Sequence, residues 1–219
     1  GNGSIWALVT NAGNTDVFLY KLDATSGVIS TGTHIYTTAR KLQPTGELTA
    51  AVPSSVISYC SGVLGMGFLS GWVQLYNTIT STATEIQIQA AATPFTMGID
   101  SDGLNFFFIA SLQGQPASGT ASWITKVDLK GAQAWQTATT NNKILNVAYD
   151  PYLGKVLAGF YYSPSTYNWA TFNVSTGAMT NSYYRDVSGA DDMYTVQPDG
   201  TGNYLIYYET VIAGTQVLD

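Results

Sequence analysis

The sequence predicts an all-β domain of about five antiparallel units, each built from up to four short strands. Three observations predict this fold class. β-Branched and aromatic residues dominate the chain, and no stretch carries apolar residues at helical spacing over the length a helix needs. One stretch, residues 143–186, divides into four strands separated by turns. Tryptophan and turn glycine then recur along the chain at intervals of about that length.

Residues 143–186 are the clearest unit. Its expected strands are 144–149, 155–162, 169–174 and 179–184. The first turn contains Asp150, Pro151 and Gly154, and the last contains Ser175, Thr176 and Gly177. These residue types favour chain reversal because they fix φ, permit positive φ or hydrogen-bond the local backbone. The unit is therefore predicted to be a four-stranded meander.

Two spacings extend this unit to the whole chain. Tryptophans open a third strand at intervals of 51 and 46 residues, at Trp72, Trp123 and Trp169. Glycines close the first turn at intervals of 41, 51 and 46 residues, at Gly62, Gly103, Gly154 and Gly200. Together they predict one domain, 1–219, with units at approximately 1–40, 47–90, 94–140, 143–186 and 190–219.

This pattern of turn glycine, third-strand aromatic and Asp/Ser-Thr-Gly turn resembles β-propeller repeat proteins in general. The resemblance covers nearly the whole chain and implies a β-propeller of about five four-stranded blades. The chain shows neither the Trp-Asp ending of WD40 repeats nor the double glycine of kelch repeats. A β-sandwich is the alternative fold, because short strands and regular turns also fit it.

The terminal units are expected to be incomplete, which gives three, four, four, four and three strands. The first unit has no first strand, and the fifth has no fourth strand. The chain is then an excised part of a longer repeat protein, or a ring with two thin blades, or a subunit that accepts a strand from a neighbour. In the last case the open edges would lie at Ile5 and Trp6 and at Val217 and Leu218, and an open edge is a site of assembly.

Composition favours an extracellular or cell-surface location. Charged residues make up 10% of the 219 residues, compared with about 25% in an average soluble domain. The surface is therefore expected to be rich in Ser, Thr, Asn, Gln and Gly. The net charge of −6 argues against nucleic acid as a partner. No apolar run reaches the roughly 18 residues of a membrane span, so membrane insertion is not expected.

Few residues suggest catalysis or metal binding. The single histidine, His34, argues against a histidine metal cluster or a Ser-His-Asp triad, and Cys60 is expected to be a buried thiol. Asp100 and Asp102 faintly resemble the start of a calcium loop, but an Asp-Gly β-turn needs the same residues. Glycoside hydrolysis needs two facing carboxylates, whereas the acids near inner strands sit mostly in turns. We therefore expect no catalytic residues and no cofactor.

The leading functional hypothesis is a non-enzymatic extracellular interaction or structural module that assembles through its edges. Its partners would be other protein subunits, including copies of itself in a homo-oligomer or polymer. The alternative is a lectin-like propeller that binds glycans, with ligand contacts from the aromatic residues Tyr161, Tyr162, Tyr167 and Trp169. A glycoside hydrolase is the less favoured third hypothesis. Asn2 and Asn173 lie in Asn-x-Ser sequons and are candidate glycosylation sites.

Overall fold

The computed structural model describes residues 4–10, 16–37, 53–68, 72–88, 94–113, 121–139, 143–163, 166–186, 192–212 and 215–218. These residues form five antiparallel sheets and contain no helix. The sheets have three, four, four, four and three strands in chain order. The all-β prediction and the incomplete terminal units are therefore confirmed.

Each complete sheet is a meander in which consecutive strands pair. The second sheet contains β4 (Pro53–Cys60), β5 (Val63–Phe68), β6 (Trp72–Asn77) and β7 (Thr82–Gln87). The third contains β8 (Pro94–Ser101), β9 (Phe106–Gln113), β10 (Ser122–Asp128) and β11 (Gln133–Thr139). The fourth contains β12 (Lys143–Asp150), β13 (Lys155–Ser163), β14 (Thr166–Asn173) and β15 (Met179–Asp186).

The two terminal sheets lack different strands. The first contains β1 (Ser4–Thr10), β2 (Asp16–Asp23) and β3 (Thr33–Thr37), which match the second to fourth strands of a complete sheet. The fifth contains β16 (Asp192–Pro198), β17 (Tyr204–Ile212) and β18 (Thr215–Leu218), which match the first to third strands.

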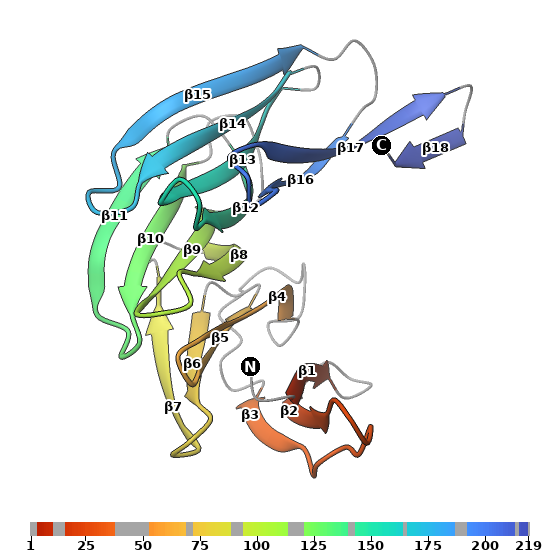
Figure 1. The fold of residues 1–219 in the computed structure, drawn as a ribbon, viewed down its shortest axis with the longest axis vertical. Coiled ribbons are helices and arrows are strands. Elements are labelled where there is room, and N and C mark those ends of the chain that lie inside the picture. The colour runs from red at the N-terminus through yellow and green to blue at the C-terminus, as the bar shows by residue number, and fades with distance from the viewer. Residues whose placement is uncertain are drawn as a thin grey trace.

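The sheets lie side by side along an open arc, as the blades of a propeller do (Figure 1). The first strands β4, β8, β12 and β16 lie towards the inside of the arc, and β7, β11 and β15 lie on the outside. The five sheets are called blades 1 to 5 in chain order. Blades 1 and 5 occupy the two ends of the arc, and among the described residues no strand of one pairs with a strand of the other.

Two kinds of turn recur from blade to blade. The predicted turn glycines all have positive φ: 89° at Gly62, 74° at Gly103, 59° at Gly154 and 81° at Gly200. Glycine adopts this left-handed conformation without the steric penalty that a Cβ brings. The turn between third and fourth strands begins with Asp or Asn, whose side-chain oxygen accepts backbone N–H groups farther along the turn. These residues are Asp23, Asn77, Asp128 and Asn173.

The core lies between the blades, because alternate residues of each second strand point to opposite faces. In β9, Phe107 and Ile109 pack towards blade 2, whereas Phe108 and Ala110 pack towards blade 4. We call the side of a blade that contacts the earlier blade its preceding face, and the other side its following face. Each joint between blades thus buries one following face against one preceding face.

One expected repeat position is not equivalent in the structure. Trp72 and Trp123 both lie five residues before the Asn or Asp of the next turn, but Trp169 lies four residues before Asn173. A shift of one residue along a strand moves a side chain to the other face. Trp169 accordingly packs on its following side, with Tyr204 and Ile206 of blade 5.

Candidate functional site

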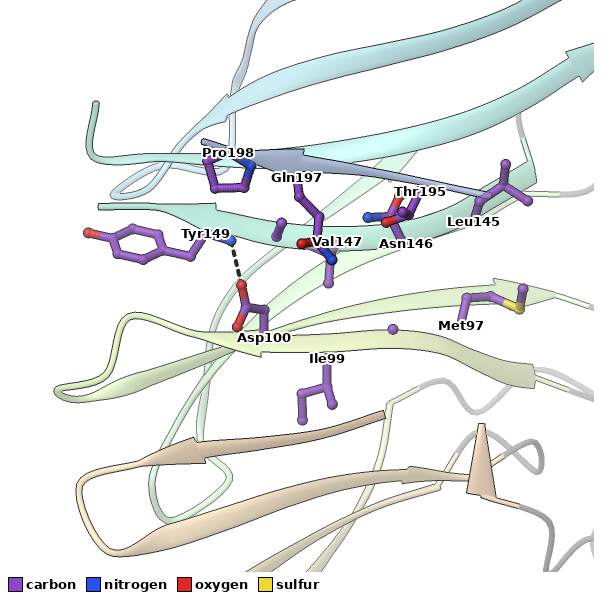
Figure 2. A pocket seen from close by; sticks show the side chains of 12 residues that line it. Met97, Ile99, Asp100, Leu145, Asn146, Val147, Tyr149, Thr195, Gln197 and Pro198 are labelled. Carbon is purple, nitrogen blue, oxygen red and sulfur yellow. Dashed lines mark hydrogen bonds between the residues drawn. The ribbon is translucent and has the colours of Figure 1, made fainter. Parts of the chain in front are cut away.

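A pocket of about 600 Å³ lies against the inner strands of blades 3, 4 and 5. Figure 2 shows residues of β8, β12 and β16 around it. Met97 and Leu145 lie at one end, while Asp100 and Pro198 lie nearer the other. The remaining lining residues are Gly98, Ile99, Asn146, Val147, Ala148, Tyr149, Thr195 and Gln197. The pocket therefore combines an apolar end with polar groups.

Each of the three inner strands has a β-bulge beside the pocket. In β8 the pairing passes from Thr96 with Ser111 to Gly98 with Ala110, so that Met97 is an extra residue. The same irregularity makes Leu145 the extra residue of β12 and Tyr194 that of β16. A bulge leaves a residue out of the ladder and redirects side chains. The repeated bulges therefore shape this part of the arc.

Asp100 is the charged residue of the pocket, and it connects three blades. Its Oδ2 accepts the backbone N–H of Tyr149 in blade 4 at 2.7 Å (Figure 2). Its Oδ1 accepts the backbone N–H of Ser101 at 2.8 Å and the hydroxyl of Ser58 in blade 2 at 3.5 Å. Burial raises the pKa of Asp100, and these hydrogen bonds only partly oppose the shift.

Asn146 connects blades 4 and 5 on the other side of the pocket. Its Nδ2 donates to the carbonyl oxygen of Val196 at 2.8 Å, and its Oδ1 accepts the backbone N–H of Val196 at 3.3 Å. The side-chain amide of Asn146 thus hydrogen-bonds the backbone at the inner edge of β16, as a neighbouring strand would. Blades 3 and 4 also come close here, because a Cβ on Gly98 would lie 3.1 Å from the backbone nitrogen of Val147.

The pocket offers little acid–base chemistry of its own. Asp100 is the single carboxylate among its lining residues, and backbone donors occupy both of its oxygens. A glycoside hydrolase needs two carboxylates on opposite sides of the scissile bond. Across the part of the chain that the structure describes, no group of three or more His, Cys, Asp or Glu side chains could hold a metal ion.

The preceding face of blade 1 is a second candidate site. Trp6 and Leu8 of β1 pack against blade 2, and so do Val17 and Leu19 of β2. The residues between them point the other way, and Ile5 is 56% and Val9 45% exposed. In blade 3 the residue equivalent to Ile5 is Phe107, which is 0% exposed because blade 2 covers it.

The following face of blade 5 is open in the same way. Val196, Tyr204 and Ile206 pack towards blade 4. Leu205, which alternates with them, is 48% exposed, whereas its equivalent in blade 4, Leu157, is 0% exposed. Blades 1 and 5 therefore expose apolar side chains at positions that the internal joints bury.

The residues predicted for the assembly edges lie in edge strands. β1 is an edge of its sheet and contains Ile5 and Trp6, and β18 is an edge that contains Val217 and Leu218. Ile5 faces outwards, but Trp6 packs against blade 2 and lies within 5.7 Å of the Lys21 ammonium group. The side chains of Val217 and Leu218 lie outside the described part.

The weak metal candidates serve local structure. Oδ1 of Asp102 accepts the backbone N–H groups of Leu104, Asn105 and Phe106 at 2.8–3.0 Å. Burial alone would raise the pKa of Asp102, but these hydrogen bonds outweigh it and lower the pKa. Asp102 thus caps the turn between β8 and β9, as Asp150 and Asp199 cap the corresponding turns of blades 4 and 5.

The aromatic residues predicted for glycan binding are only partly described. Trp169 is half-buried and stacks on Tyr183, with ring centroids 5.5 Å apart and an interplanar angle of 16°. The side chains of Tyr161, Tyr162 and Tyr167 lie outside the described residues. Their backbones belong to β13 and β14, because β14 begins at Thr166 and not at the expected Trp169. Tyr167, which falls between the expected strands 155–162 and 169–174, is therefore part of β14.

Three other predicted residues have clear surroundings. Asn173 is exposed, with its Oδ1 bound to the N–H groups of Ser175 and Thr176, while Asn2 lies outside the described residues. His34 lies in the outer strand β3 and pairs with Asp16 at 2.9 Å. Cys60 is buried, as predicted, and burial together with nearby Asp102 raises its pKa to about 11.

Comparison with known proteins supports the fold and leaves the function open. No protein-family model matches the chain, and no curated protein matches it by sequence. Several solved structures match over nearly the whole chain at 9–12% identity. Among the described residues, no helix has the length and apolar character that a membrane span needs.

The matching structures are β-propeller proteins of different activities. A europium-containing methanol dehydrogenase matches with a TM-score of 0.62 and 11% identity, over 95% of this chain and 46% of its own. The β-propeller domain of Myceliophteria thermophila Cps50 (Swd1) matches with a TM-score of 0.56 and 10% identity, over 96% of this chain and 69% of its own. KlAtg21, from its complex with the coiled-coil of AgAtg16, matches with a TM-score of 0.58 and 9% identity, over 96% of this chain and 61% of its own.

These likenesses establish the fold of this chain as a β-propeller. The chain spans less than two thirds of the length of the dehydrogenase and of Atg21. Five blades along this arc thus match part of longer propeller chains. At such low identity the likeness carries no activity from one protein to another.

Sequence reasoning missed the bulges, the Asn146 bridge and the open faces. The bulges leave no obvious signal, because FTMGID and ILNVAYD read as ordinary short strands. Asn146 reads as a polar residue within an apolar strand. An asparagine within an otherwise apolar inner strand is a signal for a cross-blade bond, since a polar group packed among apolar residues needs a partner.

Proposed function

We propose that this propeller is a non-enzymatic, extracellular interaction module that binds a protein partner through the terminal faces of its arc. The observation that carries the proposal is the exposure of Ile5, Val9 and Leu205 at positions that correspond to buried residues in complete joints. Exposed contiguous apolar surface of this kind marks interaction sites in soluble proteins. Burying it against a partner would be favourable by the same hydrophobic effect that joins the blades.

The pocket supports a structural role better than a catalytic one. Its charged residue and its asparagine are engaged in hydrogen bonds that fasten blades together. A catalytic carboxylate must instead be available to the substrate. The methanol dehydrogenase among the matching structures shares the fold at 11% identity, and a fold alone does not transfer an activity.

The extracellular location rests on the low proportion of charged residues, 10%. Asn173 offers a direct test, because its exposed side chain uses Oδ1 in the turn and leaves the amide nitrogen for a glycan. Peptide mass spectrometry of native protein should detect a glycan at Asn173 if the source glycosylates its secreted proteins. Intracellular recovery of the native protein would contradict the proposed location.

The interaction itself is tested by light scattering on native, source-derived protein. We expect a particle larger than the 23.4 kDa chain that dissociates in denaturant to a polypeptide of the size encoded in the source. Cross-linking followed by mass spectrometry should place partner contacts within 4–10 or 204–212. A native particle that consists of one 23.4 kDa chain alone would refute the interaction module.

One observation favours carbohydrate binding as the second candidate. Tyr183 is 40% exposed and stacks on Trp169, and sugars bind to aromatic faces. A glycan array should then give hits that Tyr183→Ala abolishes. Tyr152→Ala is the matched control, because Tyr152 is 65% exposed and lies in a turn away from that pair. An array without hits would remove this candidate.

A further inference from the structure

The pocket against the inner strands of blades 3, 4 and 5 has the size and composition of a small-molecule site. Its volume of about 600 Å³ falls within the roughly 300–1,000 Å³ of such sites, which are mostly apolar with a few placed polar groups. All of its lining residues belong to β8, β12 and β16 (Figure 2). Three successive blades of one chain therefore form it.

Two bulge residues form the apolar end of the pocket. Met97 of β8 and Leu145 of β12 are the extra residues of their strands, and Figure 2 shows both side chains at the same end. Ile99 and Val147 also line the pocket. The hydrocarbon part of a ligand is therefore favoured here, because removing apolar surface from water is favourable.

The other end carries one negative charge without a counter-ion. Asp100 lies three positions after Met97 in β8, which corresponds to roughly 10 Å along a strand. The lining includes no lysine, arginine or histidine. In the part of the chain that the structure describes, the one ion pair joins His34 to Asp16 and leaves Asp100 without a basic partner. The pocket is therefore electrostatically suited to a cation.

The carboxylate of Asp100 keeps room for another hydrogen-bond donor. An ionised carboxylate accepts about four hydrogen bonds, and the structure gives this one three, two from backbone N–H groups and one from the Ser58 hydroxyl. Burial raises the pKa of Asp100, because the ionised form is poorly solvated. A positive group beside the carboxylate would offset that cost.

Two further polar side chains line the pocket without a bond of their own. Within the described residues, neither Thr195 nor Gln197 forms a side-chain hydrogen bond. The hydroxyl oxygen of Thr195 and the amide oxygen of Gln197 can each accept an N–H group. Together with Asp100 they give the pocket several acceptors and a single charge.

We infer that this pocket binds a primary ammonium ion that carries an apolar chain, with the ammonium group at Asp100 and the chain at Met97 and Leu145. A divalent metal ion fits poorly, because calcium takes roughly six to eight oxygen ligands and Asp100 is the single carboxylate of the lining. Binding needs no proton transfer, so Asp100 keeps the bonds that connect the blades. The inference goes beyond the proposed function, since it concerns a small ligand and not a protein partner.

An NMR titration of the purified, isotope-labelled chain tests the site with hexylammonium, hexanol and hexanoate, which have equal chain lengths. We expect hexylammonium to bind roughly 10-fold or more tightly than hexanol and to shift the Tyr149 and Ser101 amides, which donate to Asp100. Hexanoate should bind most weakly, because like charges repel. Methylammonium should bind more weakly than hexylammonium, because it leaves the apolar end empty.

A substitution at the charged end separates the two parts of the site. Asp100→Asn should weaken hexylammonium binding roughly 10- to 100-fold, since a hydrogen bond to a charged acceptor is lost, and should leave hexanol binding unchanged. Asp128→Asn is the matched control, because Asp128 also accepts backbone N–H groups in blade 3 but does not line the pocket. It should bind hexylammonium as the wild type does. Circular dichroism confirms that both variants fold.

Three results would overturn the inference. Two concern the unaltered chain and therefore decide even if Asp100→Asn does not fold: hexylammonium that leaves the Tyr149 amide unshifted, and hexanol or hexanoate that binds as tightly as hexylammonium. The third is a folded Asp100→Asn variant with wild-type affinity for hexylammonium. None of these results bears on the light-scattering test of the native particle, so the proposed function stands or falls separately.

Discussion

The bridge between blades 4 and 5 depends on a side chain that both donates and accepts. In Asn146→Asp the introduced carboxylate can still accept the N–H of Val196, but it can no longer donate to the carbonyl oxygen, which Nδ2 now reaches at 2.8 Å. The variant loses one hydrogen bond and gains a repulsive contact between two acceptors. We expect a loss of about 2–4 kcal/mol in stability at neutral pH, from a net bond of roughly 1 kcal/mol and a buried unsatisfied group of about 1–3.

The effect should depend on pH with a definite sign. A protonated carboxyl can donate to the carbonyl oxygen of Val196 and restore the bridge. The folded state therefore favours the protonated form, and the introduced carboxyl should have a pKa above the ordinary value of about 3.9. Its stabilising contribution is present at low pH and is lost as the pH rises through the folded-state pKa. The deficit relative to wild type should thus grow from pH 3 to pH 7.

Two measurements report the effect. Urea unfolding gives the global stability, and hydrogen exchange at the Val196 amide reports local opening of blade 5, which can separate before the whole arc unfolds. Asn181→Asp is the control, because Asn181 is exposed on β15 and the described structure gives its side chain no hydrogen bond. Equal, small effects of both substitutions at pH 7 would refute the importance of the bridge.

Three further predictions follow from single residues. In thermal melts, Gly177→Ala should lower the stability by about 1–3 kcal/mol more than Gly27→Ala does. The two glycines have similar φ (72° and 70°), but only a Cβ at Gly177 would collide with Trp135. Equal losses would contradict the packing of this turn. Cys60, buried with a pKa of about 11, should resist a thiol reagent at pH 8 until the protein is denatured; stoichiometric labelling of native protein would disprove its burial. Burial raises the pKa of Asp100, so ionisation of this carboxyl opposes folding. In urea unfolding, the stability advantage of wild type over Asp100→Asn should therefore be largest near pH 3 and shrink as the pH rises above about 4. An advantage that grows with pH would contradict the raised pKa.

Much of the blade architecture could be predicted from local patterns. Turn glycines at Gly62, Gly103, Gly154 and Gly200 need positive φ, and the structure gives all four that conformation. Asp and Asn at the ends of third strands cap the following turns, which is chemistry within a few residues. The three-stranded first and last sheets could also be predicted, since the strand and turn patterns near each end mark three strands.

The tryptophan spacing shows where such prediction fails. Trp169 lies in a third strand as expected, but a shift of one residue turns it to the opposite face from Trp123. Only the register of the whole blade decides which neighbour a side chain meets. Tyr167 lies between the expected strands 155–162 and 169–174 for a related reason, because strand pairing, and not composition, extends β14 to Thr166.

The sequence by itself determined the class of fold, the number of units and the position of the turns, because these depend on interactions between residues close in the chain. The tertiary structure alone decided the bulged inner strands, the Asn146 bridge and which side chains of blades 1 and 5 are exposed. Each of these depends on contacts between residues tens of positions apart, such as Asn146 and Val196. Local patterns contain no record of what a blade packs against, and that contact determines which surfaces remain for a partner.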